Sequence, residues 1–291
     1  MLSDLHASLQ DAVRMGFLHS SRARGRVRTG LKHAADIRFI GHEGTGSEIT
    51  VLHFELPRFG SAAPDFFRQA SFWDDQPSPD DTAIELLGSA LNDVSARKAD
   101  SSRFDPPLLS RISRYSRMLQ RGIDRVSLVD AALPSVPRID ADVVEAASQL
   151  AAVTPGGQRV RVAGRLDLMG ASERVLKIEV RPGEFVTVLW EQDEPVEAFH
   201  ELFNKDVVIE GIAVFRPSGT VLRIDADLIG PASSQEDFFR EVPRAVVPRD
   251  YDKATHLRPG ERSAYLQLRG CVPAGDNESD ADFEAALAAL R

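Results

Sequence analysis

The stretch that decides the fold runs from residue 158 to residue 230 and reads QRVRVAGRLDLMGASERVLKIEVRPGEFVTVLWEQDEPVEAFHELFNKDVVIEGIAVFRPSGTVLRIDADLIG. Five of its segments predict β-strands, and the first two alternate apolar and polar side chains, which is the pattern of half-buried strands. The five segments are 159–169, 175–180, 185–190, 207–215 and 221–229. A short helix is predicted over 194–203, between the third and the fourth segment. The stretch therefore predicts five strands and one helix in about 73 residues.

Two glycines within these strands refine the prediction. Gly164 interrupts the first strand and Gly211 the fourth, and a glycine inside a strand commonly marks a sharp bend. The order strand-strand-strand-helix-strand-strand with two such bends resembles the OB-fold superfamily, a five-stranded Greek-key barrel. An SH3-like barrel is the alternative, but it does not need the helix. The resemblance covers residues 158–230 and implies a surface for single-stranded nucleic acid, oligosaccharide or protein.

The rest of the chain predicts an α+β protein in four parts. Residues 1–135 form a mixed α+β region, with a helix over 3–18, a hairpin over 36–56, a helix that starts at Ser78-Pro79-Asp80-Asp81 with Ser78 as its cap, and another helix after Asp105-Pro106-Pro107. Residues 136–157 form a linker helix, residues 158–230 the OB-like barrel, and residues 231–291 an extension that ends in a helix starting at Ser279.

Composition and charge exclude several classes of protein. With 43% hydrophobic and 27% charged residues, the chain is neither collagen-like, coiled-coil nor wholly disordered. Apolar runs are too short for a membrane span, and the first 18 residues lack the order of a signal peptide. A single cysteine, Cys271, cannot form an internal disulfide. We therefore expect a cytoplasmic protein that does not bind membranes.

The net charge of −9 is unevenly distributed. Residues 1–38 hold seven Lys/Arg and three Asp, whereas the barrel stretch holds nine Lys/Arg and thirteen Asp/Glu. A barrel that binds nucleic acid should present cations to phosphates and rings to bases. The candidate nucleic-acid residues are Arg22, Arg24, Arg26, Arg28, Arg159, Arg161, Arg165, Trp190, Arg216 and Arg223. The acidic balance of the barrel argues against a phosphate-binding role for its part of this set.

A second set of arginines lies on one predicted helix. Arg111, Arg114, Arg117 and Arg121 recur at three, three and four residues, which places them on one face opposite Leu108, Ile112, Tyr115 and Leu119. The spacing fits either a solvated helix face or a phosphate-binding surface. Convergence of this set with the arginines of 22–28 would favour a nucleic-acid site in the N-terminal region.

Catalytic motifs are missing from the sequence. No GxSxG, HExxH, Walker or CxxC motif is present, and the seven histidines have no metal-ligand spacing. Asp167 and Glu179-Val180-Arg181 imitate the acidic pair and cation of a metal-dependent nuclease, although that pattern has Lys where this chain has Arg181. We expect no catalytic residue, no cofactor and no metal, with a metal-dependent nuclease as the last alternative.

The C-terminal stretch combines acidic and apolar residues. Asp276, Glu278, Asp280 and Asp282 lead into an amphipathic helix whose apolar stripe includes Phe283, Leu287 and Leu290, the candidate residues for docking a partner. It resembles the acidic tails of small operon-encoded bacterial proteins, including some antitoxins. We therefore predict a non-enzymatic protein-interaction, adaptor or regulatory subunit, possibilities that include an antitoxin-like or assembly role. The alternative is a protein that binds single-stranded DNA or RNA.

Overall fold

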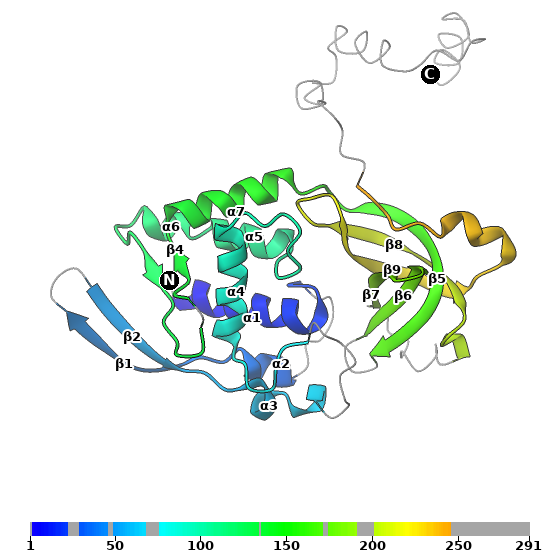
Figure 1. Ribbon diagram of the computed structural model, residues 1–291. Helices are drawn as coiled ribbons and strands as arrows, with labels where there is room; N and C mark the ends of the chain where they lie inside the picture. Colours follow the sequence, from blue (N-terminus) through cyan, green and yellow to red (C-terminus); the bar gives the residue numbers. More distant parts are fainter. Residues whose placement is uncertain are drawn as a thin grey trace, which may run out of the picture. The chain divides into compact units, whose positions relative to one another are not determined.

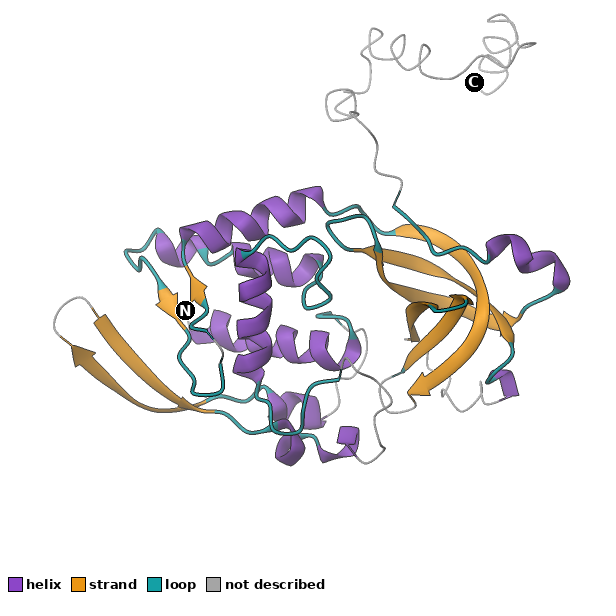
Figure 2. Ribbon diagram, viewed as in Figure 1, coloured by secondary structure: helices purple, strands orange, loops and turns teal. Residues whose placement is uncertain are grey.

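The computed structural model describes residues 2–22, 29–45, 49–67, 76–133, 135–170, 174–190 and 201–245, all of which belong to one compact unit. The fold is mixed α+β and contains a closed five-stranded β-barrel, as predicted (Figures 1 and 2). Buried apolar side chains gather in two separate cores, one among the helices and one inside the barrel. Within the described residues, no helix is long and apolar enough to cross a membrane.

The N-terminal region is built from helices and two small sheets (Figure 2). Its elements are α1 (Leu2–Leu18), α2 (Thr29–Ala34), β1 (Arg38–Thr45), β2 (Ile49–Glu55), α3 (Phe59–Ala62), η1 (Pro64–Phe67), α4 (Ala83–Ser95), α5 (Pro106–Ser113), α6 (Ser116–Leu119), β3 (Val126–Ser127), β4 (Arg138–Ile139) and α7 (Ala141–Val153). The predicted helix at the start and the predicted hairpin are both confirmed. The predicted linker helix is α7, and it packs against α5 and α4 in the same core.

The start of α4 differs from the prediction. Residues 78–81 form a turn in which the Asp81 carboxylate accepts a hydrogen bond from the Ser78 amide at 2.8 Å. The helix begins at Ala83, because Thr82 and Glu85 form a reciprocal capping box. Asp105 caps α5, with its carboxylate accepting a hydrogen bond from the Leu108 amide at 3.1 Å.

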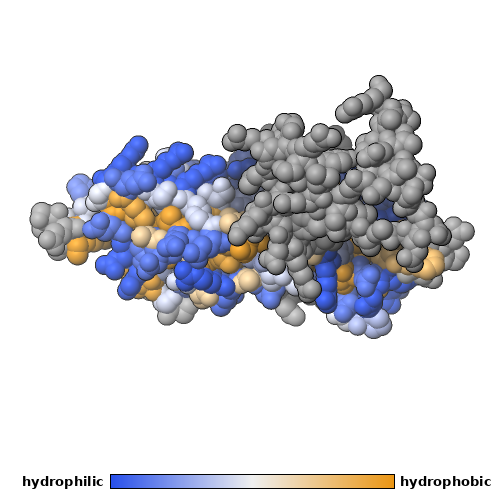
Figure 3. Space-filling view, turned by 90° about the horizontal axis from the view of Figure 1, so that it is seen from above, coloured by the Kyte–Doolittle hydropathy of each residue, from blue (hydrophilic) through white to orange (hydrophobic). Residues whose placement is uncertain are grey.

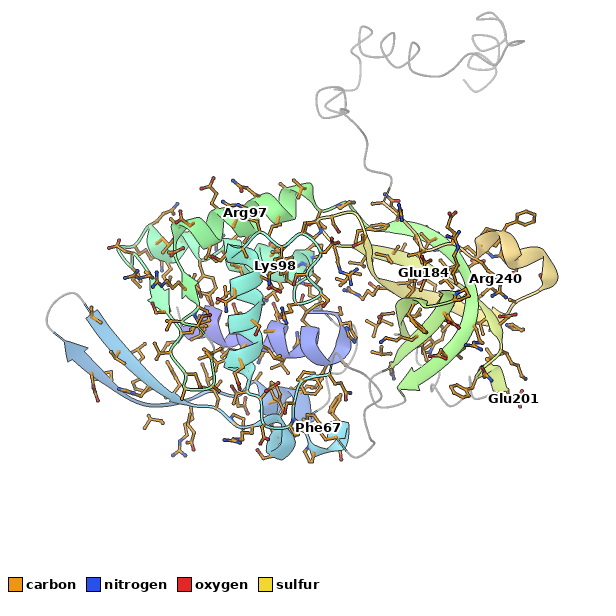
Figure 4. The ribbon with its side chains drawn as sticks, viewed as in Figure 1. Phe67, Arg97, Lys98, Glu184, Glu201 and Arg240 are labelled. Carbon is orange, nitrogen blue, oxygen red and sulfur yellow. The ribbon has the colours of Figure 1, made fainter. Side chains whose placement is uncertain are left out.

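Aromatic side chains close one side of the helical core. The Phe17 ring lies edge-to-face against the rings of Phe59 and Phe66, with centroids 5.1 Å apart in both cases. The third ring, that of Phe67, lies 5.9 Å away (Figure 4). The phenylalanines of α3 and η1 therefore pack on α1.

The barrel consists of β5 (Gln158–Gly170), β6 (Val175–Arg181), β7 (Glu184–Trp190), β8 (Asp206–Phe215) and β9 (Val221–Pro231), followed by η3 (Ser234–Phe239). The strands follow the order β5-β6-β7-β9-β8 around the barrel, and β8 closes it against β5. All neighbours are antiparallel except β7 and β9, which run parallel. The five predicted strands are thus confirmed.

The two glycines lie where strands approach too closely for a side chain. A Cβ on Gly164 would lie 2.7 Å from the carbonyl oxygen of Glu179, and one on Gly211 would collide with the carbonyl oxygen of Asp225. The register between β8 and β9 shifts at Gly211. Both positions therefore require glycine for close contact between strands. Most of the helix predicted over 194–203, and all of the C-terminal helix, lie outside the described residues.

Candidate functional site

Three exposed arginines of β5 are paired with carboxylates. Arg159 lies 3.1 Å from Asp227 of β9, and Arg165 lies 2.6 Å from Glu179 of β6. The arginine between them, Arg161, has a more extensive set of contacts. Its guanidinium lies 3.3 Å from Glu210, 2.5 Å from Glu236 and 5.0 Å from the centre of the Phe239 ring. The neighbouring strands and η3 thus neutralise this row of cations.

Backbone contacts hold two of these carboxylates ionised. A hydrogen bond from the Gly183 amide, together with the nearby Arg165 guanidinium, lowers the pKa of Glu179. The Ser233 amide and Arg161 lower the pKa of Glu236 in the same way. A phosphate approaching β5 would have to compete with carboxylates that are themselves stabilised as anions.

Arg223, one of the candidate nucleic-acid residues, does not lie on an accessible barrel face. Its side chain is 6% exposed, because the outer side of β9 faces the helical region at this point. The guanidinium donates to the His19 carbonyl at 2.9 Å and lies 2.6 Å from Asp225 and 3.5 Å from Asp105, whose side chain is fully buried. Arg223 therefore joins the barrel to the helices instead of contacting a ligand.

The remaining barrel candidates, Trp190 and Arg216, are both engaged by the fold. Trp190 is 4% exposed and forms part of the barrel core, so its ring cannot serve as a stacking surface for a base. Arg216 lies in the β8–β9 turn and donates to the carbonyl oxygen of Val221. The same turn packs on the helical region, where the Ser218 amide donates to the Ala99 carbonyl at 3.2 Å and Thr220 to Asp100 at 3.0 Å.

Among the N-terminal arginines, only Arg22 falls within the described residues, and it is exposed. Arg24, Arg26 and Arg28 lie outside them. The segment is held at its start, because the Ser21 amide and hydroxyl donate to the Asp105 carboxylate at 3.0 and 2.5 Å. Asp105 caps the N-terminus of α5, whereas Arg114, Arg117 and Arg121 follow its C-terminus. Arg22, the described member of the first set, thus follows a segment held at the end of α5 opposite to Arg114, Arg117 and Arg121.

The arginines of the α5–α6 run divide into two kinds. Arg111 forms an ion pair with Asp11 of α1, whose pKa is raised by burial against the lowering effect of that arginine. Arg114, Arg117 and Arg121 are exposed, as are Arg125 and Arg138 nearby on the β3–β4 side. None of these five forms an ion pair with any other described residue. We call Arg114, Arg117, Arg121, Arg125 and Arg138 the arginine stripe.

Contacts on the buried side of the α5–α6 run determine which way the arginine stripe faces. Tyr115 and Met118 are buried against the helical core. The Tyr115 hydroxyl lies 3.0 Å from the Ser8 hydroxyl, and burial raises the pKa of Tyr115 to about 12. The phenol therefore stays neutral and anchors the run against α1.

The β1–β2 hairpin exposes apolar side chains. Phe39, Ile40, Ile49 and Val51 are between 40% and 64% exposed. Within the described residues these two strands pair only with each other, so each has an edge without a backbone partner. Hydrophobic surface is visible at the end of the molecule where this hairpin lies (Figure 3). The alternation of the sequence predicts the hairpin, but it does not indicate that both of its faces carry exposed apolar groups.

Two of the three nuclease-like residues, Glu179 and Arg181, are engaged in other contacts, and the third is Asp167. Glu179 is bonded to Arg165 and to the Gly183 amide, while Arg181 lies 3.4 Å from Glu241. Asp167 is exposed. In the part of the chain that the structure describes, no three His, Cys, Asp or Glu side chains form a group suited to a metal ion.

Comparisons with known proteins return no relative. No family model, no curated protein and no solved structure matches this chain. The function of the protein is therefore inferred from its residues and their geometry.

Proposed function

We propose that this protein is a non-enzymatic binding protein of the cytoplasm, an adaptor or regulatory subunit that attaches to a partner protein through the β1–β2 hairpin. An antitoxin-like or assembly role belongs to the same class. The observation that carries the proposal is the exposure of Phe39, Ile40, Ile49 and Val51 on a sheet of only two strands. An isolated two-stranded sheet is marginally stable in water, and exposed apolar strand edges favour pairing with another chain.

Strand β2 is the better edge for such pairing. Its sequence, ITVLHFE, is rich in β-branched and aromatic residues, and its register is regular along its whole length. Strand β1 contains two interior glycines, Gly41 and Gly44, and its register shifts between Phe39 and Gly41. Backbone pairing to β2 would supply affinity, and the exposed Ile49 and Val51 would supply apolar contacts.

The barrel fits a structural role in this proposal. We infer an OB-like barrel from its strand order and from the parallel contact between β7 and β9. The ion pairs of Arg159, Arg161 and Arg165 weigh against binding of single-stranded nucleic acid by the β5 side of the barrel. The turn between β8 and β9, which carries ligand contacts in many OB-folds, here packs on the helical region.

A pull-down from the native host tests the proposal. The bait is the full chain, compared with an Ile49→Glu/Val51→Glu variant and with a Val129→Glu control, whose residue is 77% exposed in the segment between β3 and β4. We expect a stoichiometric partner with the wild type and the control, and at least a ~10-fold loss with the hairpin variant. Equal recovery with all three baits would refute the hairpin as the docking surface.

A truncated bait that ends at residue 278 separates the hairpin from the C-terminal stripe. Phe283, Leu287 and Leu290 lie outside the described residues, so the stripe is tested by deletion. Retention of the partner by the truncated bait supports the hairpin. Its loss, together with retention by the hairpin variant, would assign docking to the C-terminal residues instead.

A further inference from the structure

We propose that the arginine stripe binds the phosphate backbone of a nucleic acid. This site is separate from the hairpin and does not depend on the protein-binding role proposed above. It also differs from the barrel face, where the arginines are already paired. Three observations carry the proposal: the spacing of the cations, their lack of partners among the described residues, and the polar character of the exposed residues from Ser110 to Ser127.

The spacing follows from the local structure. Residues 106–121 form a nearly continuous helical run, in which α6 follows α5 after Arg114 and Tyr115. Residues three and four apart on a helix are neighbours about 5–6 Å apart, so Arg114, Arg117 and Arg121 make a single row. Gly122, with φ of +89°, ends the run. The chain then turns into β3, which places Arg125 just beyond the row.

The fifth cation comes from a distant part of the sequence. Strand β4 pairs antiparallel with β3, and Arg138 lies opposite Ser127. Arg125 precedes Ser127 by two residues, so Arg125 and Arg138 are diagonal neighbours on that small sheet. The fold thus extends a row of three cations into a surface of five.

The stripe carries charge that the protein leaves uncompensated. Residues 106–129 contain five arginines and one carboxylate, Asp124, in a chain whose net charge is −9. The other arginine of this run, Arg111, is held by Asp11. Cations without partners are the ones that release counterions when they neutralise phosphates, because no internal ion pair has to break first.

The surroundings favour phosphates over an acidic protein. The exposed residues from Ser110 to Ser127 are arginines, serines, a glutamine, a glycine and Asp124, with no apolar side chain among them. A protein interface usually has buried apolar or aromatic anchors at its centre. The aromatic side chain in this run, Tyr115, is 4% exposed and cannot stack on a base. Contacts to the backbone of a duplex therefore fit the stripe better than readout of an unstacked strand.

Salt-dependent DNA binding by the full chain tests the proposal. The probes are a labelled 20-base-pair duplex and one of its single strands, titrated between 50 and 200 mM NaCl. The test variant is Arg114→Gln/Arg117→Gln/Arg121→Gln, and the matched control is Arg159→Gln/Arg161→Gln/Arg165→Gln, which removes the same number of exposed arginines from β5. Circular dichroism and urea unfolding confirm that both variants fold.

The expected result distinguishes the two surfaces. The wild type binds the duplex at least as tightly as the single strand. The stripe variant weakens duplex binding at 150 mM NaCl by at least ~10-fold and reduces the slope of log K against log salt by about 3, whereas the control changes neither.

Three results would overturn the proposal. They are no duplex binding at 50 mM NaCl, an equal loss of binding in the two variants, and displacement of the duplex by poly-glutamate at the same charge concentration. The last of these would assign the stripe to an acidic protein. Loss of the protein partner in the pull-down, by contrast, would affect only the hairpin.

Discussion

The barrel and the α5–α6 run both display arginines at a regular spacing on one face, but the two rows are used differently. On β5, Arg159, Arg161 and Arg165 alternate along the strand, and each lies beside a carboxylate of a neighbouring element. On the helical run, Arg114 and Arg117 follow the same kind of regularity without any described partner. The spacing of cations along a segment therefore says little about their availability, which is decided by the elements packed beside them.

The largest effect is expected at the most engaged arginine of the barrel. Replacing Arg223 with Met leaves Asp105 buried without its cation, although Asp105 still caps α5 and binds Ser21. Removing one partner of a buried ion pair typically costs about 3–5 kcal/mol. Urea unfolding at pH 7 measures this loss, with Arg159→Met as the exposed control. A loss below ~1 kcal/mol for Arg223→Met would show that this contact does not hold the barrel to the helices.

A smaller but substantial effect is expected at the glycine that brings β8 and β9 together. A methyl group at Gly211 would collide with the backbone of Asp225 and Ala226, and forcing side-chain atoms into a packed site typically costs about 1–3 kcal/mol. Gly230, near the C-terminal end of β9, has open space where its side chain would be, and it serves as the control. Urea unfolding of Gly211→Ala and Gly230→Ala should differ by this amount. Equal stability would mean that the strands can separate at Gly211 without cost.

These two sites show what could be predicted from the sequence. The alternation of the strands and the positions of Gly164 and Gly211 predict the barrel, because both depend on local geometry. The burial of Arg223 could not be predicted, because alternation shows only that its side chain leaves the barrel interior. It cannot show that Asp105 and the His19 carbonyl lie against Arg223 on the outside of β9. The partner Asp105 is 118 residues away in the sequence.

The candidate surfaces could likewise be predicted from the sequence only in part. The acidic balance of the barrel anticipates that its arginines are neutralised, although the individual partners Asp227, Glu210 and Glu236 come from the fold. The sequence also places Arg111 with Arg114 and Arg117 on one helix face, but it cannot show that Asp11 of α1 removes Arg111 from that set. The exposure of the hairpin could not be predicted from the sequence either, because a strand pattern does not reveal which faces of the hairpin another element covers.

A third prediction concerns the carboxylates of the helical region. Asp93 is buried, and burial alone would raise its pKa, but hydrogen bonds from Lys98, Arg103 and Ser101 hold the pKa below its usual 3.8 (Lys98 is labelled in Figure 4). A carboxyl with a lowered pKa in the folded state stabilises the fold above the unfolded pKa. That contribution is lost as the pH falls through the folded value.

We therefore expect Asp93→Asn to cost about 1–3 kcal/mol at pH 6, because charged hydrogen bonds are replaced by neutral ones. The difference from the wild type should be smaller at pH 2.5 than at pH 6, because the stability gained from a carboxylate with a lowered pKa is lost as the pH falls below its unfolded value. Urea unfolding at the two pH values measures both quantities. A difference that stays constant with pH would show that the charge of Asp93 does not contribute to stability.

The smallest effect compares one arginine from each row. Arg159→Gln removes an exposed ion pair with Asp227 and should lower the free energy of unfolding by at most ~0.5 kcal/mol. Arg117→Gln removes a cation that lies between Arg114 and Arg121 at helical spacing, so it relieves repulsion and should stabilise the protein by a few tenths of a kcal/mol. The opposite signs are the useful result, since both residues are exposed and both changes remove one charge. Because 1 M NaCl shortens the screening length to about 3 Å, both effects should diminish there. Urea unfolding at 50 mM and 1 M NaCl measures both effects. A loss of stability in Arg117→Gln at low salt would mean that the stripe contributes to folding and is not available to a ligand.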